Sequence, residues 1–289
     1  MGGDLAGALM SGALLPSFRR ILAGTDGSER SLEAVARASS IAAAAGATFD
    51  VVFVIDTHHA HGSDIEDEAE DALRRAADTA REHGAEATTS VIAGDPGEAL
   101  LQEAVEDGAD LVAVGPDAGL LGGAIRVGRV AASVLRDAPM SVLLGREAGE
   151  GFPRRIRCGV DGSEGSTATA AVAAGLAEAT GAELRLQHVV PVFRGDNAEW
   201  TIGPDDEMPP ELAPAVAAVR DLGVDPVVEM AMGRPEHAMV ETAHRDDVDL
   251  LVVGHRGMSG VARVLLGSVS EHVARHAHCS VLVARLATR

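Results

Sequence analysis

The chain has 289 residues, enough for about two domains of typical size, and 46% of them are hydrophobic but only 2% aromatic. Its core therefore has to be built from Ala, Val, Leu and Ile, which is typical of a parallel sheet buried between helices. The formal net charge is −20 and all 24 basic residues are arginines. This acidity argues against a nucleic acid partner, and the missing lysine excludes a Walker A phosphate loop.

The sequence favours a cytoplasmic protein without disulfides. Cys158 and Cys279 are far apart and each falls in an expected buried strand, so we interpret them as small core residues. No apolar run approaches the roughly 18 residues of a transmembrane helix. Residues 1–17 have neither a basic start nor a convincing cleavage site, so we expect a loose leader rather than a signal peptide.

In chain order, short apolar strands alternate with helices that begin at Asp-Gly-Ser or near a proline. The first half is expected to contain a strand at 21–24, an Ala-rich helix, a strand at 49–55, a helix over about 64–83, a strand ending at Gly94, a helix from about Pro96, a strand at 111–114, a fourth helix and a strand at 141–144. The second half is expected to contain the same elements at 156–160, after Ser163, at 184–190, over about 210–222, up to Gly233, from about Pro235, at 250–253, and lastly at 280–283. This alternation predicts right-handed βαβ units and a parallel sheet.

The second half of the chain repeats the first. RRILAGTDGSERSLEAVARASS aligns with RRIRCGVDGSEGSTATAAVAAG at an offset of 135 residues (161 minus 26). Further on, GDPGEALLQEAVEDGADLVAVG aligns with GRPEHAMVETAHRDDVDLLVVG at an offset of 139 (233 minus 94). A repeat this long predicts two tandem doubly wound domains. We expect them at 18–146 and 156–286, joined by a linker at 147–155.

Two loops of the second half are expected at the carboxyl edge of its sheet, where open α/β sheets bind ligands. One is GVDGS, and the other is GHRGMSGVARVLLGSVS, which begins at Gly254. Its glycines would let the backbone approach a ligand, and the helix after Gly267 would present amides and a dipole that favour an anion. Ser268 would cap that helix or donate to a phosphate oxygen, with Ser270 within reach.

Each of these residues also has an explanation that needs no ligand. Glycines serve tight turns and serine is a common helix cap. Asp161 is compatible with a structural turn, which Asp-Gly favours, with contact to an adenine or ribose, and with a metal carboxylate. The histidines of THHAH, which are His58, His59 and His61, favour a solvated loop over a metal site. For His255 and Arg256 a phosphate contact and a solvent-facing role stay open, and Trp200 is expected to pack within an enlarged loop.

The order of GVDGS, a G-x-P motif and G-x2-G-x9-G-S resembles the ATP-binding branch of the universal stress protein family. The resemblance covers about residues 19–286, so the chain resembles a tandem member. It implies a five-stranded parallel sheet in each half, flanked by helices, with ATP where the strand order reverses. Asp161 would face the adenine or ribose and Val189 would offer its backbone to the adenine. The ribose and phosphates would lie along Gly254, Gly257, Gly267, Ser268 and Ser270.

The first half departs from this pattern. Asp26, Gly115 and Gly128 are retained, but Ala118 replaces Gly257, Arg129 replaces Ser268 and Ala131 replaces Ser270. Alanine strains a turn that needs positive φ, and the hydroxyl contact is lost. Arg129 would either fill the pocket or pair with a phosphate. We predict a weakened or silent first site in which Asp26 is kept mainly for structure.

The sequence contains no recognisable catalytic constellation. We therefore expect an ATP-binding regulatory or stress-response protein with at most slow hydrolysis, in which Mg²⁺ arrives with the nucleotide because lysine is missing. The alternative is an interaction module with relic nucleotide loops. A nucleotidyl transferase would need a cationic or histidine motif at the phosphates. The family implies that the halves pack as an intramolecular pseudo-dimer, through the edges with the last strands, and that the chain forms a homodimer.

Overall fold

The computed structural model describes residues 18–58, 65–116, 120–121, 124–125, 127–191, 199–203, 207–255 and 266–285. In the first half the elements are β1 (Arg20–Thr25), α2 (Glu29–Ala45), β2 (Thr48–Asp56), α3 (Ile65–Glu82), β3 (Ala87–Gly94), α4 (Pro96–Glu106), β4 (Leu111–Val114), the short β5 (Leu120–Leu121) and β6 (Ala124–Ile125), α5 (Arg129–Asp137) and β7 (Ser141–Leu144). In the second half they are β8 (Arg155–Val160), α6 (Glu164–Thr180), β9 (Glu183–Pro191), β10 (Glu199–Thr201), α7 (Ala213–Arg220), β11 (Val227–Gly233), α8 (Pro235–Arg245), β12 (Leu250–Gly254), α9 (Ser268–His276) and β13 (Ser280–Ala284).

The expected strands and helices of both repeats are present, and local sequence signals explain their ends. Ser28 and Ser163 cap α2 and α6 by accepting hydrogen bonds from the backbone N–H groups of Ser31 and Ser166. Both helices end at a glycine in the left-handed conformation, with φ of 64° at Gly46 in the first half. A proline opens α4 and α8, as expected at a first helical position.

One expectation about the second half is wrong. The segment around Trp200 was expected to be a loop, but Glu199–Thr201 form β10, which pairs antiparallel with the outer edge of β11. The backbone groups at a sheet edge need hydrogen-bond partners, and this short segment supplies them. The helix expected over about 210–222 is also shorter, because α7 spans only Ala213–Arg220.

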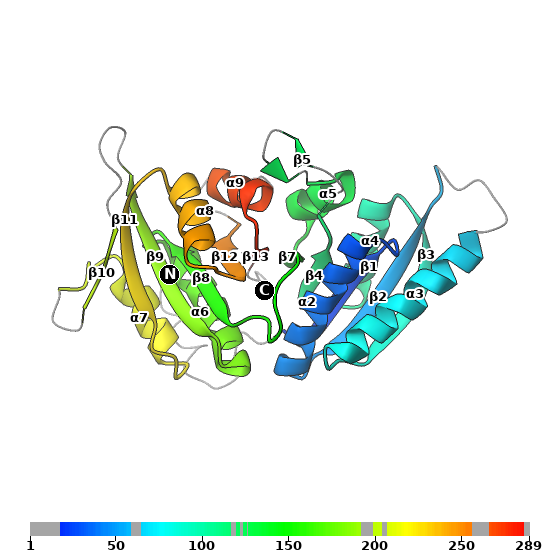
Figure 1. Ribbon diagram of the computed structural model, residues 1–289, viewed down its shortest axis with the longest axis horizontal. Helices are drawn as coiled ribbons and strands as arrows, with labels where there is room; N and C mark the ends of the chain where they lie inside the picture. Colours follow the sequence, from blue (N-terminus) through cyan, green and yellow to red (C-terminus); the bar gives the residue numbers. More distant parts are fainter. Residues whose placement is uncertain are drawn as a thin grey trace.

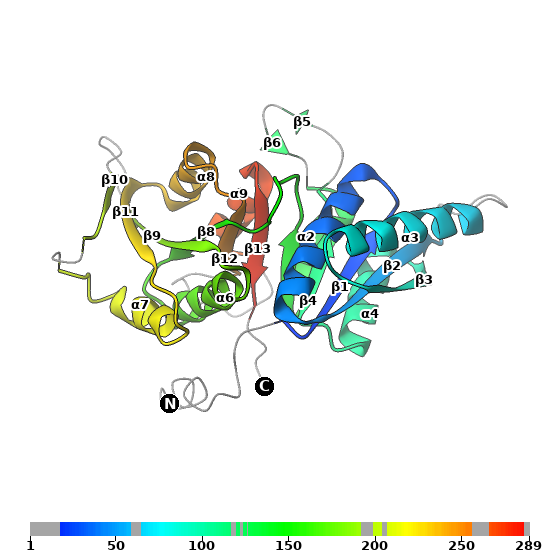
Figure 2. The ribbon, with the colours of Figure 1, turned by 60° about the horizontal axis from the view of Figure 1, so that its bottom comes forward.

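All the main strands belong to one 11-stranded sheet, in the order β10-β11-β9-β8-β12-β13-β7-β4-β1-β2-β3 (Figures 1 and 2). Each half contributes five parallel strands, and the strand order reverses between β1 and β4 and between β8 and β12. This confirms the predicted fold class of two tandem doubly wound units.

The two halves meet where β7 and β13 pair antiparallel. Leu143 lies opposite Leu282, its own equivalent in the second repeat, and Val142 lies opposite Val283. The pairing therefore has a local two-fold symmetry centred on two equivalent leucines. In Figure 1 the chain accordingly forms two similar lobes on either side of these central strands.

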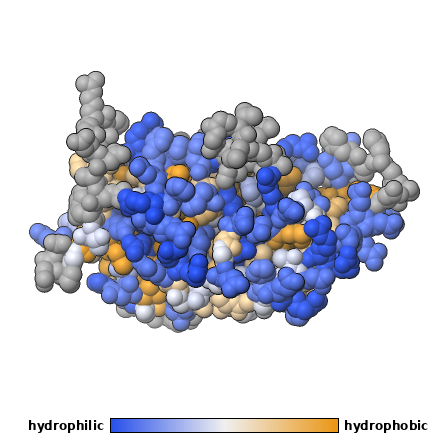
Figure 3. Space-filling view, in the orientation of Figure 1, coloured by the Kyte–Doolittle hydropathy of each residue, from blue (hydrophilic) through white to orange (hydrophobic). Residues whose placement is uncertain are grey.

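A separate apolar core covers each face of the sheet, and each core extends through both halves. One includes Ile21 and Ala38 of the first half with Leu186 and Leu212 of the second. The other joins residues of β4, α5, β12 and α9. Outside these cores, Figure 3 shows a mainly hydrophilic surface interrupted by apolar patches. Among the described residues, no helix is long and apolar enough to cross a membrane.

The two cysteines are free and buried, in agreement with their interpretation as core residues. Cys158 belongs to one core and Cys279 to the other, so they lie on opposite faces of the sheet. Burial raises the pKa of each thiol to about 12. Both therefore stay protonated at neutral pH and are unsuited to thiolate chemistry.

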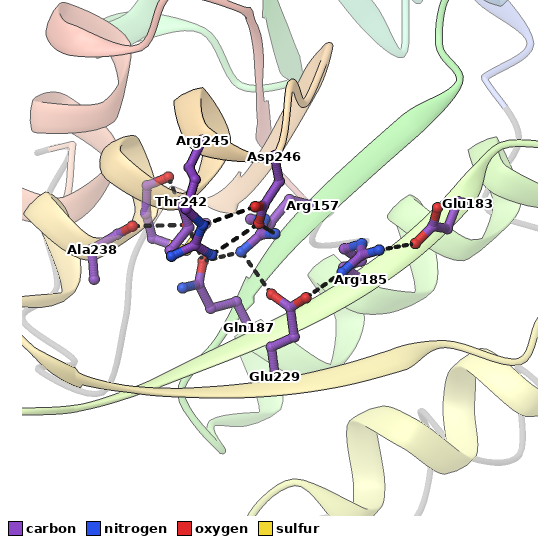
Figure 4. A network of polar contacts seen from close by, with 10 residues as sticks. Arg157, Glu183, Arg185, Gln187, Glu229, Ala238, Thr242, Arg245 and Asp246 are labelled. Carbon is purple, nitrogen blue, oxygen red and sulfur yellow. Dashed lines mark hydrogen bonds and ion pairs between the residues drawn. The ribbon is translucent and has the colours of Figure 1, made fainter. Parts of the chain in front are cut away.

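A buried arginine holds α8 against the sheet in the second half (Figure 4). The Arg157 side chain on β8 is 0% exposed and pairs with Glu229 of β11 at 2.8 Å and with Asp246 at the end of α8 at 2.5 Å. It also donates to Gln187 of β9 at 3.2 Å, and Thr242 of α8 donates to the same Gln187 oxygen at 2.9 Å. The equivalent position in the first half is the apolar Leu22.

Candidate nucleotide site

The Asp-Gly-Ser loop after β8 is a turn stabilised by its own side chains. Asp161 Oδ1 accepts hydrogen bonds from the backbone N–H of Ser163 at 3.0 Å and from its hydroxyl at 2.6 Å. Gly162 has a φ of 81°, and a Cβ there would lie 3.0 Å from the Cβ of Glu211. The turn interpretation of Asp161 is thus supported, and a nucleotide contact is an additional role that stays a prediction.

Asp26 forms the same turn in the first half, where its Oδ1 accepts from the backbone N–H of Ser28 at 2.9 Å. Burial opposes its ionisation and is the largest effect on its pKa. Hydrogen bonds from Ser28 and Ser31 together outweigh burial, so the pKa of Asp26 lies below its ordinary value of 3.8. This carboxylate stabilises the turn before α2, and its being kept mainly for that role stays a prediction.

The strand β12 and the helix α9 are tied together beside the Asp161 turn. β12 pairs with β8, and the register matches Val252 with Cys158, so Gly254 and Val160 end adjacent strands. The backbone N–H of His255 donates to the carbonyl of Ala284 at 3.1 Å, and that of Gly267 donates to the carbonyl of His255 at 2.8 Å. These bonds fix the start of α9 at the carboxyl edge of the sheet.

Ser270 contributes to this anchoring. The residue is buried, and its hydroxyl donates to the carbonyl of Gly254 at 2.5 Å. Its single proton is therefore committed to the backbone, and Ser270 positions the loop instead of donating to a phosphate in this conformation.

Gly267, and not Ser268, is the capping residue of α9. Gly267 has an extended conformation, with φ of −63° and ψ of 151°, and no side chain forms a cap hydrogen bond here. Ser268 is the first helical residue and is exposed. The expectation that Ser268 caps the helix is wrong, because the cap position falls one residue earlier. The first amides of α9 consequently lack an intrahelical acceptor and a side-chain cap, the arrangement that favours an anion.

Val189 lies on the same edge. Val189 belongs to β9 and lies opposite Ala231 of β11. The pairing of β9 with β8 ends one residue before it, where His188 lies opposite Val160. The structure therefore brings Val189, Asp161, Gly254 and the start of α9 together where β9, β8 and β12 end. Gly257, Arg256, Ala118, His59 and His61 lie outside the described residues. Among the described residues, no group of three or more His, Cys, Asp or Glu side chains is arranged to hold a metal ion.

The first half differs most at Arg129. Gly128 caps α5 without a side-chain bond, as Gly267 caps α9, but Arg129 then pairs with Asp56 at the end of β2 at 3.3 Å. Because β2 and β4 lie on either side of β1, this guanidinium crosses the edge where the strand order reverses. The Arg129 side chain is 68% exposed, so this ion pair lies at the surface, and both roles open for Arg129 stay predictions.

Gly115 has a packing reason that the sequence did not reveal. A Cβ at this position would lie 2.6 Å from the carbonyl oxygen of Arg30 at the start of α2, so no larger residue fits. Its retention in the first half therefore indicates nothing about a ligand. The Arg129–Asp56 pair was also missed. The one signal in the sequence was Arg129 at the first position of a helix. The start of a helix favours acidic side chains, so an arginine there indicates an acidic partner nearby.

Comparison with known proteins supports one family for both halves. The profile of the universal stress protein family matches residues 17–146 and 153–285. The universal stress protein MJ0531 of Methanocaldococcus jannaschii is 35% identical over 144 residues, which are 47% of this chain and 85% of that protein. The universal stress protein Slr1101 of Synechocystis is 42% identical over 62 residues, which are 22% of this chain and 57% of that relative.

The fold has a solved counterpart of similar length. A universal stress protein from Archaeoglobus fulgidus aligns with 92% of this chain and 98% of its own, with a TM-score of 0.70 and 22% sequence identity. At this identity the likeness concerns the fold alone. Taken with the profile matches in both halves, it leads to one conclusion: the chain belongs to the universal stress protein family, as a member with two tandem domains.

Proposed function

We propose that this protein binds ATP in its second half and that the bound nucleotide changes its shape or its choice of partner in a cytoplasmic stress response. The observation that carries the proposal is the uncapped start of α9, fixed beside Gly254 where the strand order reverses. A helix start of this kind favours phosphate, and it lies at the edge of the sheet where α/β proteins bind ligands.

Different residues of the second half would bind the phosphates, the ribose and the adenine. The N–H groups at the start of α9 and the hydroxyl of Ser268 would hold the phosphates, and Gly254 and Gly257 would let the backbone approach the ribose. Asp161 would meet the ribose or adenine, and the backbone of Val189 the adenine. Mg²⁺ would be held by phosphate oxygens and water, because the described residues offer no metal cluster and the chain has no lysine.

The first domain would be silent. Its Arg129 is already engaged with Asp56 across the corresponding edge, and the buried Ala131 stands where Ser270 anchors the second loop. We place the domains at 18–146 and 156–286, and their packing through β7 and β13 as an intramolecular pseudo-dimer belongs to the same proposal.

The direct test is to denature the purified protein, identify any released nucleotide by mass as ATP, ADP or AMP, and titrate ATP by calorimetry. We expect one site per chain. Ser268→Pro removes both a phosphate-facing N–H and a hydroxyl, and proline is well tolerated at a first helical position. It should abolish binding, whereas the matched Arg129→Pro in the first half should leave binding unchanged.

Two equal sites would overturn the asymmetry between the halves. An intact fold that binds no nucleotide would overturn the proposal and favour an interaction module with relic loops.

A further inference from the structure

The sheet ends in an open strand at the first half. β3 is the terminal strand of the sheet, and most of its residues are exposed. Its sequence, ATTSVIAG, contains neither charge nor proline. Natural proteins protect sheet edges with charged residues, prolines, bulges or a covering segment, because unpaired backbone groups recruit another strand. Within its bounds, β3 has no charge or proline to protect it.

The other end of the same sheet shows how this fold closes such an edge. The equivalent strand in the second half, β11, is mostly buried and has β10 paired antiparallel along its outer side. Figures 1 and 2 place β10 and β3 at opposite ends of the molecule. Among the described residues, the main sheet therefore ends on one side in β10, which has 3 residues, and on the other in β3, which has 8.

An apolar groove runs beside this edge, between β3 and α3. Its volume is about 530 Å³, and its apolar lining includes Ile55, Leu73 and Val91. Val91 is 47% exposed, and only one other large hydrophobic residue, Val105, is exposed among the described residues. A segment that pairs with β3 would cover Val91 and remove this apolar surface from water.

The charges around the groove are self-complementary. Because β2 and β3 are parallel, the connecting α3 runs antiparallel to them. Glu66 and Glu70 therefore line the groove toward the carboxyl end of β3, and Arg74 lines it one turn nearer the other end. Arg74 pairs with Asp71 of its own helix, and both side chains are exposed, so this pair contributes little and leaves the guanidinium accessible to another carboxylate.

We propose that a second copy of this chain docks here, with the two β3 strands pairing antiparallel about a two-fold axis perpendicular to the sheet. This operation sets the α3 helices side by side and antiparallel, so that Arg74 of each copy approaches Glu66 and Glu70 of the other. The chain already uses such a pairing internally, where Leu143 lies opposite its equivalent Leu282.

The proposed contact limits the assembly to two copies of the chain. An interface in which each copy uses the same patch is complete after one pairing. At the opposite end of the sheet, the terminal strand among the described residues is β10, which has only 3 residues and offers a much shorter edge than β3. The result is a homodimer with one continuous sheet, and the inference does not depend on nucleotide binding.

Sedimentation equilibrium of the full chain tests the proposal, at concentrations up to about 100 μM. We expect a mass of twice 29.6 kDa. Val91→Lys should return the mass to that of one chain, because it places a charge in the covered groove. Val105→Lys, which changes the 55% exposed valine on α4, is the matched control and should leave the dimer intact.

Charge exchange gives a second readout that does not depend on the stability of β3. Arg74→Glu should raise the dissociation constant about 100-fold through like-charge repulsion. Adding Glu70→Arg to the same chain should restore the dimer. Backbone amides of β3 should exchange more slowly at high protein concentration. A mass of one chain at all concentrations overturns the proposal. It would favour an extended segment of another protein as the partner that pairs with β3. A dimer that survives Val91→Lys, or is lost equally in Val105→Lys, also overturns it.

Discussion

Arg146 and Arg285 occupy equivalent positions of the two repeats, and each reaches across the β7–β13 pairing to the last helix of the opposite half. Arg146 donates to the carbonyl of Ala274 in α9 at 2.5 Å, and Arg285 donates to the carbonyl of Leu135 in α5. The last carbonyls of a helix lack intrahelical donors, and a cation there also complements the helix dipole. The two halves thus cap each other's final helices.

Loss of Arg146 should therefore weaken the junction strongly. The residue is buried and also donates to the carbonyl of Cys279 at 3.0 Å. Burial lowers its pKa to about 10, so it stays charged at neutral pH. We expect Arg146→Ala to reduce the free energy of unfolding by about 3–5 kcal/mol, because several charged hydrogen bonds and the packing of its stem are lost. Urea unfolding measures this change.

The exposed Arg129→Ala is the control for this measurement, and it should cost about 0.5 kcal/mol or less. Equal effects of the two substitutions would show that the reach of Arg146 across the junction has no special importance.

The sequence predicts most of this fold because the responsible signals are local and occur twice. Asp-Gly-Ser before a helix, proline at its first position and glycine after its end mark the same boundaries in both repeats, as at Ser28 and Ser163. The exception is β10, whose three residues form a strand only because the open edge of β11 lies beside them. No pattern within three residues records such a neighbour.

The site was predictable to the level of its loops but not of its contacts. Gly254, Gly267 and Ser268 fall where the spacing placed them, at the end of β12 and the start of α9. The commitment of Ser270 to a carbonyl, the clash that requires Gly115, and the pairing of Arg129 with Asp56 all join residues that are distant in sequence. Such contacts are settled by packing, which a single sequence does not encode locally.

The Arg129–Asp56 pair leads to a sharper design for silencing the second site. Pro191 occupies the position equivalent to Asp56, so an arginine introduced at Ser268 would find no carboxylate and would be free to pair with phosphate. We expect Ser268→Arg alone to weaken ATP binding little. Ser268→Arg combined with Pro191→Asp should weaken it about 100-fold, because the added carboxylate both pairs with the arginine and repels the phosphates at close range.

Calorimetric titration of the three variants, including Pro191→Asp alone, measures this difference. If Ser268→Arg by itself already eliminates ATP binding, a carboxylate at position 191 is not needed to silence the site, and the role that we assign to it is wrong.

Removing one member of the network around Arg157 should reduce the free energy of unfolding more than removing two members together. Arg157→Leu introduces the residue found at the equivalent position of the first half, but it removes one of the two arginines that pair with the half-buried Glu229 and the buried hydrogen bond to Gln187. We expect a loss of about 3–5 kcal/mol in the free energy of unfolding. Adding Glu229→Ser, which matches Ser90 of the first half, should recover most of this loss.

Chemical unfolding of the single and double variants measures both changes. A double variant that is less stable than Arg157→Leu would show that Glu229 has a stabilising role apart from the arginine, for example through its ion pair with Arg185.

The histidines on α8 and α9 should make the fold less stable in mild acid. Burial, followed by the neighbouring His276 and His237, lowers the pKa of His272 below its ordinary value of 6.5, and burial followed by His244 does the same for His278. The rings are in contact, with centroids of His272 and His276 separated by 4.0 Å. Below pH 6.5 the unfolded chain therefore binds more protons than the folded one, and the free energy of unfolding falls as the pH falls.

His272→Ser, which introduces the residue found at Ser133 in the first half, should reduce this loss of stability between about pH 7.5 and about pH 5.5. The measurement is the urea midpoint of both proteins at each pH. Because the variant removes the group that resists protonation, the two midpoints should agree near about pH 7.5 and separate in acid, where the variant should be the more stable protein. Parallel pH profiles for the two proteins would contradict the assignment and shift the cause of any acid sensitivity to other groups.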